Sequence, residues 1–595
     1  MHSNGAETVK RTALLAWIVW CVVSSLLAPG SARAQAGRDL AEFVQNYSAD
    51  RESVRSFYDW PWSEEAFDRT DALLDEWESR LRGVDFDALD QQGRIDYVLM
   101  RTHLASERSQ QTLARARLAE MDALLPFRRL VIELAMSRSR MEEPTPRRWA
   151  DRLAKVEDEI RAVRERIDAG RKLKEGDEPG DAIIVSAVVA ARAASATDML
   201  RRTLDDWFRY HDGYLPEFSW WVRKPHEQAT AAMADYARHL REQVAGLKGK
   251  DDDPLIGDPI GRDKLLADLA AEFIPYTPEE LIAIAEREFA WCEGEMLRAS
   301  RELGFGEDWR AALEHVKNLY EPPGGQATLM ADLARQGIDF VKQHDLVTVP
   351  ELCEEAWRLT MISPQGQRTL PFAAYNNQQI LVAYPTDAMP HDDKLMSMRG
   401  NNRHFTRIVA AHELIPGHHL QGFVARRERP YRSLFRTPFL VEGWALHWEM
   451  LLWDKGFARG PEDRVGMLFW RMHRCARIIV SLRFHLGEMT TDEMIALLVD
   501  RVGHERLGAT SEVRRYVGGD YAPIYQVAYM IGGLQLRALH AETVGAGRMT
   551  DREFHDAVLA HNAIPIELIR AGILGVPLTP ETTSVWHFFD ASGNG

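Results

Sequence analysis

The chain has 595 residues, a formal net charge of −16 and four cysteines. Its acidic charge argues against a nucleic-acid partner, and so few cysteines on so long a chain argue against a disulfide scaffold. The length exceeds what one hydrophobic core usually supports, so we expect two or more regions, or one elongated body, stabilised by packing.

The N-terminal residues have the three parts of a secretory signal peptide. Lys10 and Arg11 precede the apolar run ALLAWIVWCVVSSLLA, and the small residues of SARAQAGRD follow it. We expect cleavage near Ala34 or Ala36, which removes residues 1–36 and makes the mature protein periplasmic or secreted. The alternative is a retained membrane anchor, because the run approaches the length of a span. No later segment does, so we expect no stable membrane insertion after cleavage.

The pattern of apolar residues predicts a mainly α protein. In residues 37–250, segments such as FDRTDALLDEWESRL and TAAMADYARHLREQVAGL place apolar residues three or four apart among charges, as amphipathic helices do. The segment 246–264 is rich in Gly, Asp and Pro, which predicts a surface crossing between two regions. Helices resume in residues 263–595, where Thr277, Pro278 and Glu280 form a helix-start signal. We therefore divide the mature chain into a helical region at 37–250 and a second at 263–595.

One segment departs from the helical pattern. Residues 369–385, TLPFAAYNNQQILVAYP, have aromatic and β-branched residues on both sides of Asn376 and Asn377. This pattern predicts two short strands joined by a turn. The strands form either an ordinary structural hairpin or a sheet edge that accepts an extended peptide.

The segment AAHELIPGHHLQG, 410–422, raises the question of a metal site. Two His residues four apart on one helix can bind one zinc ion. Here His412 and His418 are six apart, roughly 600° of rotation, and His412 and His419 are seven apart, about 10.5 Å of rise, so neither pair chelates from an unbroken helix. Pro416 disrupts a helix and Gly417 tolerates unusual backbone shapes. If both loop out, His418 returns to the ligand position, although His419 stays open as the alternative.

A third ligand is predicted in RTPFLVEGWALHWEMLLWDKG. Thr437 caps this helix, Pro438 takes its first position and Gly456 ends it. Glu442 lies in its first turns among Phe, Leu, Val and Trp side chains, and a carboxylate in such surroundings needs a cation. An arginine is the alternative partner, but the position shortly after His418 favours a metal ion.

The motifs HELIPGHHLQ and EGWALHWE resemble those of the bacterial family called domain of unknown function 885, whose members are inferred to be zinc metallopeptidases. GRIDYVLMRTHL and YTPEELIAIAEREF extend the resemblance along the mature chain. The family is largely helical, and its site is similar to those of gluzincin peptidases such as the thimet-oligopeptidase and carboxypeptidase Taq groups. The resemblance implies a large helical metallopeptidase-like body, with His412, His418 and Glu442 as zinc ligands and Glu413 as catalytic base.

A C-terminal segment, RRYVGGDYAPIYQVAYMIGGLQLRAL, resembles a family segment that runs Pro, Gln-Ala, Tyr, Gly. Pro523, Tyr529 and Gly532 fit its spacing. Tyr525 stands where the Gln is expected, so this segment departs from the family pattern and the role of that Gln is in doubt here.

The residue types predict hydrolysis. Three protein ligands leave one zinc position for water, the ion lowers the pKa of that water, and Glu413 accepts its proton before attack on a peptide carbonyl. Tyr529 is the candidate donor to the developing oxyanion, by analogy with gluzincin tyrosines, with His419 and His447 as alternatives. His447 and Glu449 are also candidates for orienting the ligands or binding substrate.

The predicted function is an exported zinc-dependent peptidase, a hydrolase that acts on peptides. One alternative keeps the metal, since two His and one carboxylate also bind iron in oxygenases, although Glu413 favours hydrolysis. The other is an inactive helical binding protein in which Pro416 has disabled the site. The sequence leaves open the oligomeric state, endo- or exopeptidase action, the preferred side chain and whether the substrate is a peptide or another amide.

Overall fold

A computed structural model describes residues 40–589 except 250–252, 369, 371 and 520. The predicted signal peptide, residues 1–36, lies outside the described residues. The described chain is mainly helical with one small sheet, which confirms the predicted fold class. Within it, no helix combines the length and the apolar character that a membrane crossing requires.

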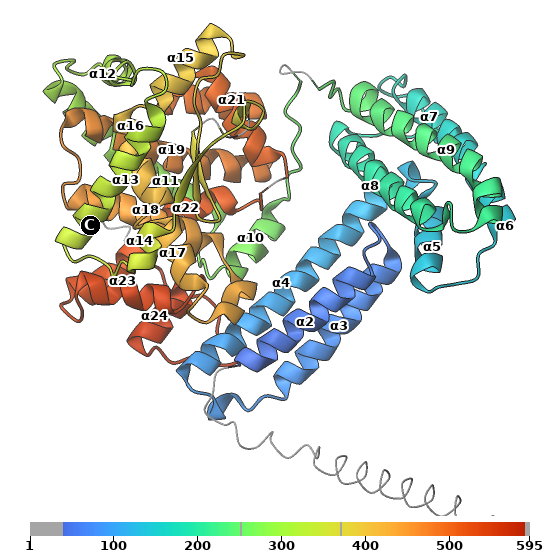
Figure 1. Cartoon of the computed structure of the whole chain (residues 1–595), viewed down its shortest axis with the longest axis horizontal. Helices are drawn as coiled ribbons and strands as arrows, with labels where there is room; N and C mark the ends of the chain where they lie inside the picture. The colour runs from blue at the N-terminus through green and yellow to red at the C-terminus, as the bar shows by residue number, and fades with distance from the viewer. Residues whose placement is uncertain (1–39, 250–252, 369, 371, 520, 590–595) are drawn as a thin grey trace, which may run out of the picture.

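Two groups of helices form the N-terminal part of the chain (Figure 1). The first is α2 (Ala41–Phe57), α3 (Glu64–Arg82) and α4 (Gln91–Met121). The second, which packs at the far end of α4, is α5 (Arg128–Ser139), α6 (Pro146–Leu153), α7 (Val156–Gly170), α8 (Ala187–His211) and α9 (Pro216–His239). Because α4 has 31 residues, it is long enough to reach from the C-terminal body to this second group.

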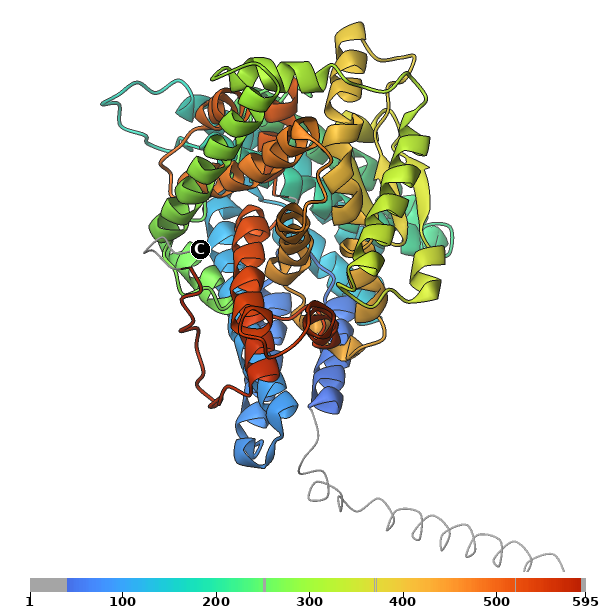
Figure 2. The same cartoon turned by 90° about the vertical axis from the view of Figure 1, so that its left-hand side faces the viewer.

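The remaining helices build a C-terminal body (Figures 1 and 2). They are α10 (Arg262–Ala271), α11 (Pro278–Glu302), α12 (Trp309–Lys317), α13 (Gln326–Gln343), α14 (Glu351–Glu355), α15 (His391–Gly400), α16 (Arg403–Glu413), α17 (His418–Ala425), α18 (Pro438–Asp454), α19 (Pro461–His485), α20 (Thr491–Leu497), α21 (Arg506–Val517), α22 (Tyr525–His540), α23 (Asp551–Ala560) and α24 (Ile566–Leu574). Helix α18 packs along α22, α11 along α19, and α16 contacts α13, α18 and α19. The predicted capping box at Thr277 begins α11.

The largest hydrophobic core joins the first group of helices to the body. It includes Val44, Trp77 and Ile95 of α2, α3 and α4 together with residues from α10 to α24. A buried ion pair crosses this junction: Arg432 Nε donates to Asp96 Oδ1 at 2.7 Å, and both side chains are fully buried. A separate core fills α5 to α9. The domain boundary near residue 250 stays a prediction, but the cores group α2, α3 and half of α4 with the body.

The predicted hairpin is confirmed and belongs to a three-stranded sheet. Strand β2 (Ala373–Asn376) pairs antiparallel with β3 (Gln379–Val382) across the turn at Asn377 and Gln378. Strand β1 (Arg358–Met361) pairs parallel with β3, so the order is β1-β3-β2 and β2 is an outer strand. Ile380 and Val382 pack on Ala410 and Leu414, which places the sheet against α16.

Candidate metal centre

Helix α16 is anchored at its first turn. The side-chain oxygen of Asn402 accepts the backbone N–H of His404 at 3.0 Å, and the Asn402 amide donates to the carbonyl of Val316 at 2.8 Å. Gly466 of α19 lies against the same turn, because a Cβ there would be 2.1 Å from the His404 carbonyl oxygen. The start of α16 is thus held from two sides.

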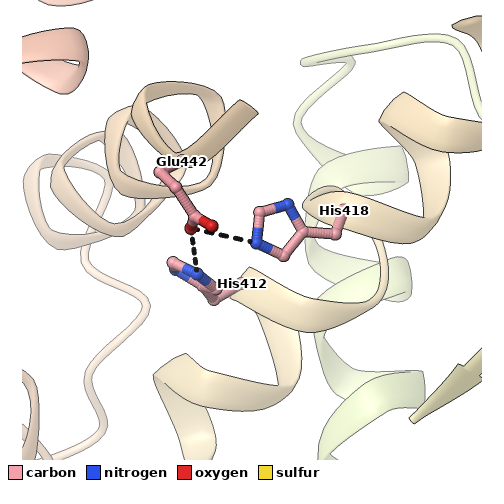
Figure 3. A group of neighbouring side chains, drawn as sticks. All are labelled: His412, His418 and Glu442. Carbon is pink, nitrogen blue, oxygen red and sulfur yellow. Dashed lines mark ion pairs between the residues drawn. The ribbon is translucent and has the colours of Figure 1, made fainter. Parts of the chain in front are cut away.

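The helix is interrupted where the sequence predicts it. Helix α16 ends at Glu413, the chain leaves helical geometry over Leu414–Gly417, and α17 begins at His418. The Gly417 N–H donates to the carbonyl of Ala411, six residues back, at 3.0 Å, so the interruption is a wide turn. Figure 3 shows the result: His418 points toward His412 across this turn.

The backbone around position 417 leaves no room for a side chain, so the residue there must be glycine. A Cβ on Gly417 would lie 1.7 Å from the carbonyl oxygen of His412 and 2.6 Å from that of Ala411. Both contacts are with backbone, which has no rotamer to change. A close approach that only glycine permits therefore sets the distance between the two histidines.

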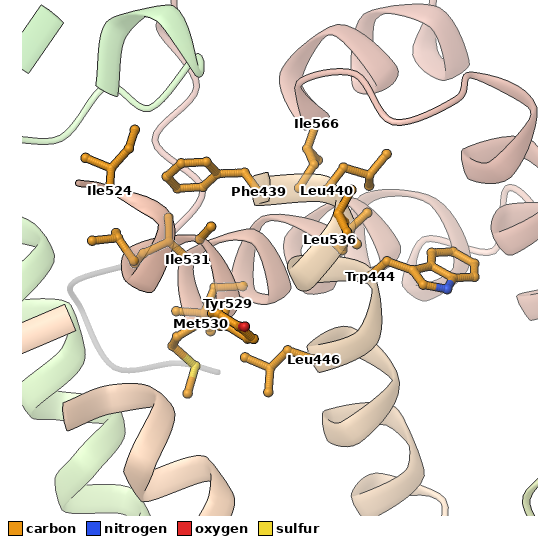
Figure 4. Packing of buried hydrophobic residues seen from close by; sticks show 14 of the residues in the cluster. Phe439, Leu440, Trp444, Leu446, Ile524, Tyr529, Met530, Ile531, Leu536 and Ile566 are labelled. Atoms are coloured by element: carbon orange, nitrogen blue, oxygen red, sulfur yellow. The ribbon is translucent and has the colours of Figure 1, made fainter. Parts of the chain in front are cut away.

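Helix α18 supplies the carboxylate. The Thr437 hydroxyl accepts the Phe439 N–H at 3.0 Å and Pro438 takes the first position, as the sequence predicts. Helix α22 crosses α18 closely, because a Cβ on Gly443 would lie 2.5 Å from the backbone of Gly532. Large apolar side chains surround this crossing (Figure 4). It holds Glu442, the neighbour of Gly443, in the centre of the body.

The three predicted ligands converge (Figure 3). One donor atom each from His412, His418 and Glu442 lies within 4.8 Å of the other two. Glu442 Oε2 is 3.6 Å from His412 Nε2 and 3.3 Å from His418 Nε2, and this buried oxygen has no hydrogen-bond partner among the described residues. Tetrahedral zinc with bonds of about 2.0–2.2 Å keeps its ligand atoms about 3.3–3.5 Å apart. The donor set and the two distances to Glu442 therefore fit zinc.

The surrounding charges favour a cation at this point. His412 Nδ1 is 2.7 Å from Glu449 Oε1, which Arg474 also contacts at 3.4 Å. Burial lowers the pKa of His412, but the neighbouring carboxylates of Glu442 and Glu449 outweigh that effect and raise the pKa to about 9. Burial raises the pKa of Glu442, and the adjacent His418 and His412 reverse this and hold it well below its ordinary value. When the ring donates Nδ1–H to Glu449, its Nε2 lone pair faces the centre.

Glu413 lies beside this cluster at the end of α16. Its side chain is half-buried, and its charge contributes to the raised pKa of His412. Among the described residues, none forms a hydrogen bond or ion pair with its carboxylate. The predicted base therefore has no competing partner in the described part of the chain.

His419 has both ring nitrogens engaged elsewhere. Its Nε2 donates to the carbonyl of Cys353 at 2.8 Å, and its Nδ1 accepts from the hydroxyl of Tyr375 at 3.1 Å. Burial lowers the pKa of His419, which favours the neutral ring that this pattern needs. Of the two adjacent histidines that the sequence leaves open, the structure brings only His418 to the cluster, and His419 joins α17 to α14 and β2.

His447 points away from the cluster, which corrects its prediction as a ligand-orienting or oxyanion-binding residue. Its Nε2 is 3.0 Å from Nε2 of His555, whose Nδ1 donates to the carbonyl of Leu346 at 2.8 Å. The physical reason is helical phase: His447 is five positions after Glu442, so its side chain leaves α18 on another face. Glu449, seven positions after Glu442, returns to the face that meets His412.

Tyr529 lies against the cluster through its ring. The ring stacks on that of His412 with centroids 6.3 Å apart and planes 15° apart. The guanidinium groups of Arg477 and Arg474 lie 4.5 and 4.8 Å from the ring centroid. Burial raises the pKa of the Tyr529 hydroxyl, so it stays protonated and able to donate.

Tyr525 is a contact of the cluster that sequence reasoning did not assign. Its hydroxyl donates to Glu442 Oε1, while the other carboxylate oxygen, Oε2, contacts the two histidines. Burial is the largest cause of the raised pKa of this phenol, which keeps the proton on it. Helical spacing was the available signal, because Tyr525 is four residues before Tyr529 and therefore shares its face.

Two solved structures have folds similar to that of this chain. A candidate lipoprotein of unknown function from Shewanella oneidensis is similar over 90% of this chain and 100% of its own, with 18% identity and a TM-score of 0.66. A candidate lipoprotein from Colwellia psychrerythraea is similar over 90% of this chain and 98% of its own, with 15% identity and a TM-score of 0.56.

The sequence comparisons differ in outcome. None of the curated proteins has a significant sequence match to this chain. The family model described as a bacterial protein of unknown function, DUF885, matches residues 57–573, which contain α3 to α23 and every residue of the cluster. Since this match spans most of the chain, the protein belongs to the DUF885 family.

Proposed function

We propose that this protein is an exported zinc-dependent peptidase in which Glu413 is the general base. The observation that carries the proposal is the convergence of His412, His418 and Glu442, with a buried carboxylate oxygen that lacks a hydrogen-bond partner among the described residues. Zinc bound by three such ligands supplies a Lewis acid and a water of lowered pKa. The adjacent Glu413 favours hydrolysis over oxygenation.

The residues around the cluster have separate tasks in this proposal. Glu449 holds the His412 ring by its Nδ1–H, so that Nε2 faces the centre. Glu413 accepts a proton from water and returns it to the leaving amine. The Tyr529 hydroxyl is the candidate donor to the developing oxyanion, since burial keeps it protonated. The Tyr525 hydroxyl donates to Glu442 and so orients this ligand.

The proposal includes export to the periplasm or the medium and a peptide substrate. Export is supported by the signal-like residues 1–36 and by the two similar structures, which are described as candidate lipoproteins. A hydrolytic site built from two His, two Glu and tyrosine hydroxyls suits the hydrolysis of an uncharged amide bond. The peptide bond is the most abundant amide bond in biological molecules.

Metal analysis of the purified mature protein is the first test. We expect near-stoichiometric zinc, which His418→Ala abolishes and the matched His419→Ala variant retains, because only His418 contributes to the cluster. Iron instead of zinc contradicts the peptidase and favours an oxygenase. No metal after incubation with zinc contradicts any metal enzyme and favours a binding protein.

Peptide cleavage is the second test. A mixed peptide library is incubated with wild type and Glu413→Gln, and the products are identified by mass spectrometry. We expect Glu413→Gln to keep zinc but lose about 10²- to 10⁴-fold in rate, the usual contribution of a general base. Equal rates for the two proteins would exclude Glu413 from this role.

A further inference from the structure

A cavity of about 590 Å³ lies beside the first turns of α16, the helix that ends with His412 and Glu413. This volume is in the range of sites that bind small molecules or large side chains. Its walls are largely apolar, and the large apolar side chains that line it are Phe372, Met389, Met396, Phe405, Phe469 and Leu507.

Two cations that line the cavity are neutralised by ion pairs. Lys317 and Arg399 line it, but each pairs with Glu505 at 3.3 Å, and Arg399 also pairs with Glu314. Neutralised cations and largely apolar walls suit a mainly apolar occupant.

Helix α16 connects this cavity to the candidate metal centre. Phe405 lines the cavity and His412 follows it by seven residues on the same helix. At about 1.5 Å per residue this places the two positions about 10 Å apart along α16.

The small sheet also connects the cavity to the candidate metal centre. Phe372 lines the cavity and immediately precedes β2, and Tyr375 of β2 has its ring 6.4 Å from that of His418. Three residues of extended chain span about 10 Å. Along α16 the cavity and the candidate metal centre are therefore about 10 Å apart, and the sheet joins them a second time through Phe372, Tyr375 and the ring contact with His418.

An extended peptide matches this separation. Its residues repeat every 3.3 Å or so, and about 10 Å therefore corresponds to three residues. Strand β2 is the outer strand of its sheet and its residues are half-buried or exposed, which leaves a side for such a peptide.

We propose that the cavity binds a large apolar side chain of the substrate, about three residues from the bond that is cleaved. The inference rests on the proposed peptidase function and narrows its substrates to peptides with an aromatic or large aliphatic residue at that position. Burial of such a side chain is worth about 1.5–3 kcal/mol, which corresponds to a preference of about ten- to a hundredfold over alanine.

The test uses paired peptides that differ only in Phe or Ala at the third residue on either side of the cleaved bond. For wild type we expect kcat/KM at least about tenfold higher for Phe on one side. Gly508→Leu should remove that difference, because Gly508 lines the cavity and a Cβ there meets only His504 Nδ1, at 3.9 Å, so a larger side chain enters the cavity without backbone strain.

Two variants control for folding. Gly294→Leu makes the same change on α11, where a Cβ meets nothing within 4 Å, and should leave the Phe preference unchanged. Leu507→Glu places a charge at an exposed wall position of the cavity, and should abolish the preference even if Gly508→Leu does not fold. A Phe preference that survives in both cavity variants overturns the inference.

A binding measurement separates this inference from the peptidase proposal. Fluorescein-labelled Phe and Ala peptides are titrated into Glu413→Gln with and without Gly508→Leu, and fluorescence anisotropy is followed. Tighter binding of the Phe peptide that Gly508→Leu removes supports the cavity even if wild type cleaves nothing, in which case only the peptidase proposal fails. Cleavage by wild type without any Phe preference overturns the cavity inference alone.

Discussion

Gly443→Ala is expected to force α18 and α22 apart. The added Cβ would lie 2.5 Å from the carbonyl carbon and 2.6 Å from the Cα of Gly532. Carbon atoms pack best at about 3.5–4.0 Å, so one helix has to move by about 1 Å. Because backbone atoms are on both sides, no side-chain rotation relieves the contact. Overpacking of this kind costs about 1–3 kcal/mol of the free energy of unfolding.

The same displacement reaches the candidate metal centre. Glu442 precedes Gly443, and its contacts with His412 and His418 are only 3.6 and 3.3 Å long. The hydrogen bond from Tyr525 to Glu442 also crosses between the two helices. A shift of about 1 Å moves the carboxylate out of the position that suits zinc, and we expect at least about tenfold weaker zinc binding.

Urea unfolding and chelator competition measure the two effects. Gly294→Ala is the matched control, since it changes the same residue type at an exposed position of α11, where a Cβ has open space. It should stabilise the protein by up to about 1 kcal/mol, because alanine favours the helix over glycine. If Gly443→Ala is as stable as Gly294→Ala and binds zinc like wild type, the crossing does not position Glu442 and the reasoning is refuted.

Three further outcomes are expected. Glu449→Gln keeps an acceptor for His412 Nδ1–H but removes its charge, so zinc affinity measured by chelator competition should fall about 10- to 100-fold, and an unchanged affinity would exclude this role. Tyr525→Phe removes the hydrogen bond to Glu442, so zinc affinity measured in the same way should fall about 10- to 100-fold, and a wild-type affinity would show that this bond does not orient Glu442. His485 is buried and its pKa is lowered to about 4, chiefly by burial, so the unfolded chain, in which the pKa is about 6.5, binds the proton first as pH falls. Above pH 6.5 the ring is neutral in both the folded and the unfolded protein, so it does not change the free energy of unfolding. Between about pH 6.5 and 4 the buried neutral ring should lower the free energy of unfolding by up to about 3 kcal/mol. Urea unfolding at pH 7 and 4 should accordingly show a smaller loss for His485→Leu than for wild type, and equal losses would contradict the assignment.

Local rules account for most of what the sequence predicted correctly. Apolar periodicity predicted the helices, the Asn376-Asn377 pair predicted the hairpin turn, and Pro416 predicted the interruption before His418. These features depend on residues close together in sequence, where helix phase, capping and turn chemistry act. His447 and Glu449 were both candidates for orienting the ligands, because they follow Glu442 on the same helix.

Helix phase relative to neighbours accounts for what sequence reasoning missed. His447 and Glu449 are two residues apart, and only the packing of α18 decides that Glu449 meets His412 while His447 meets His555. Tyr525 was read as a departure from a family pattern, whereas the close crossing of α22 over α18 brings its hydroxyl to Glu442.

The sequence by itself determined the helical fold class and the interruption of the histidine motif. It also identified His412, His418 and Glu442 as candidate metal ligands. Only the tertiary structure decided that their donor atoms come within 4.8 Å, that His419 is engaged elsewhere and that a cavity lies beside the first turns of the same helix. The physical reason is that the close approaches at Gly417, and at Gly443 with Gly532, are set by long-range packing, in which apolar burial brings segments distant in sequence together.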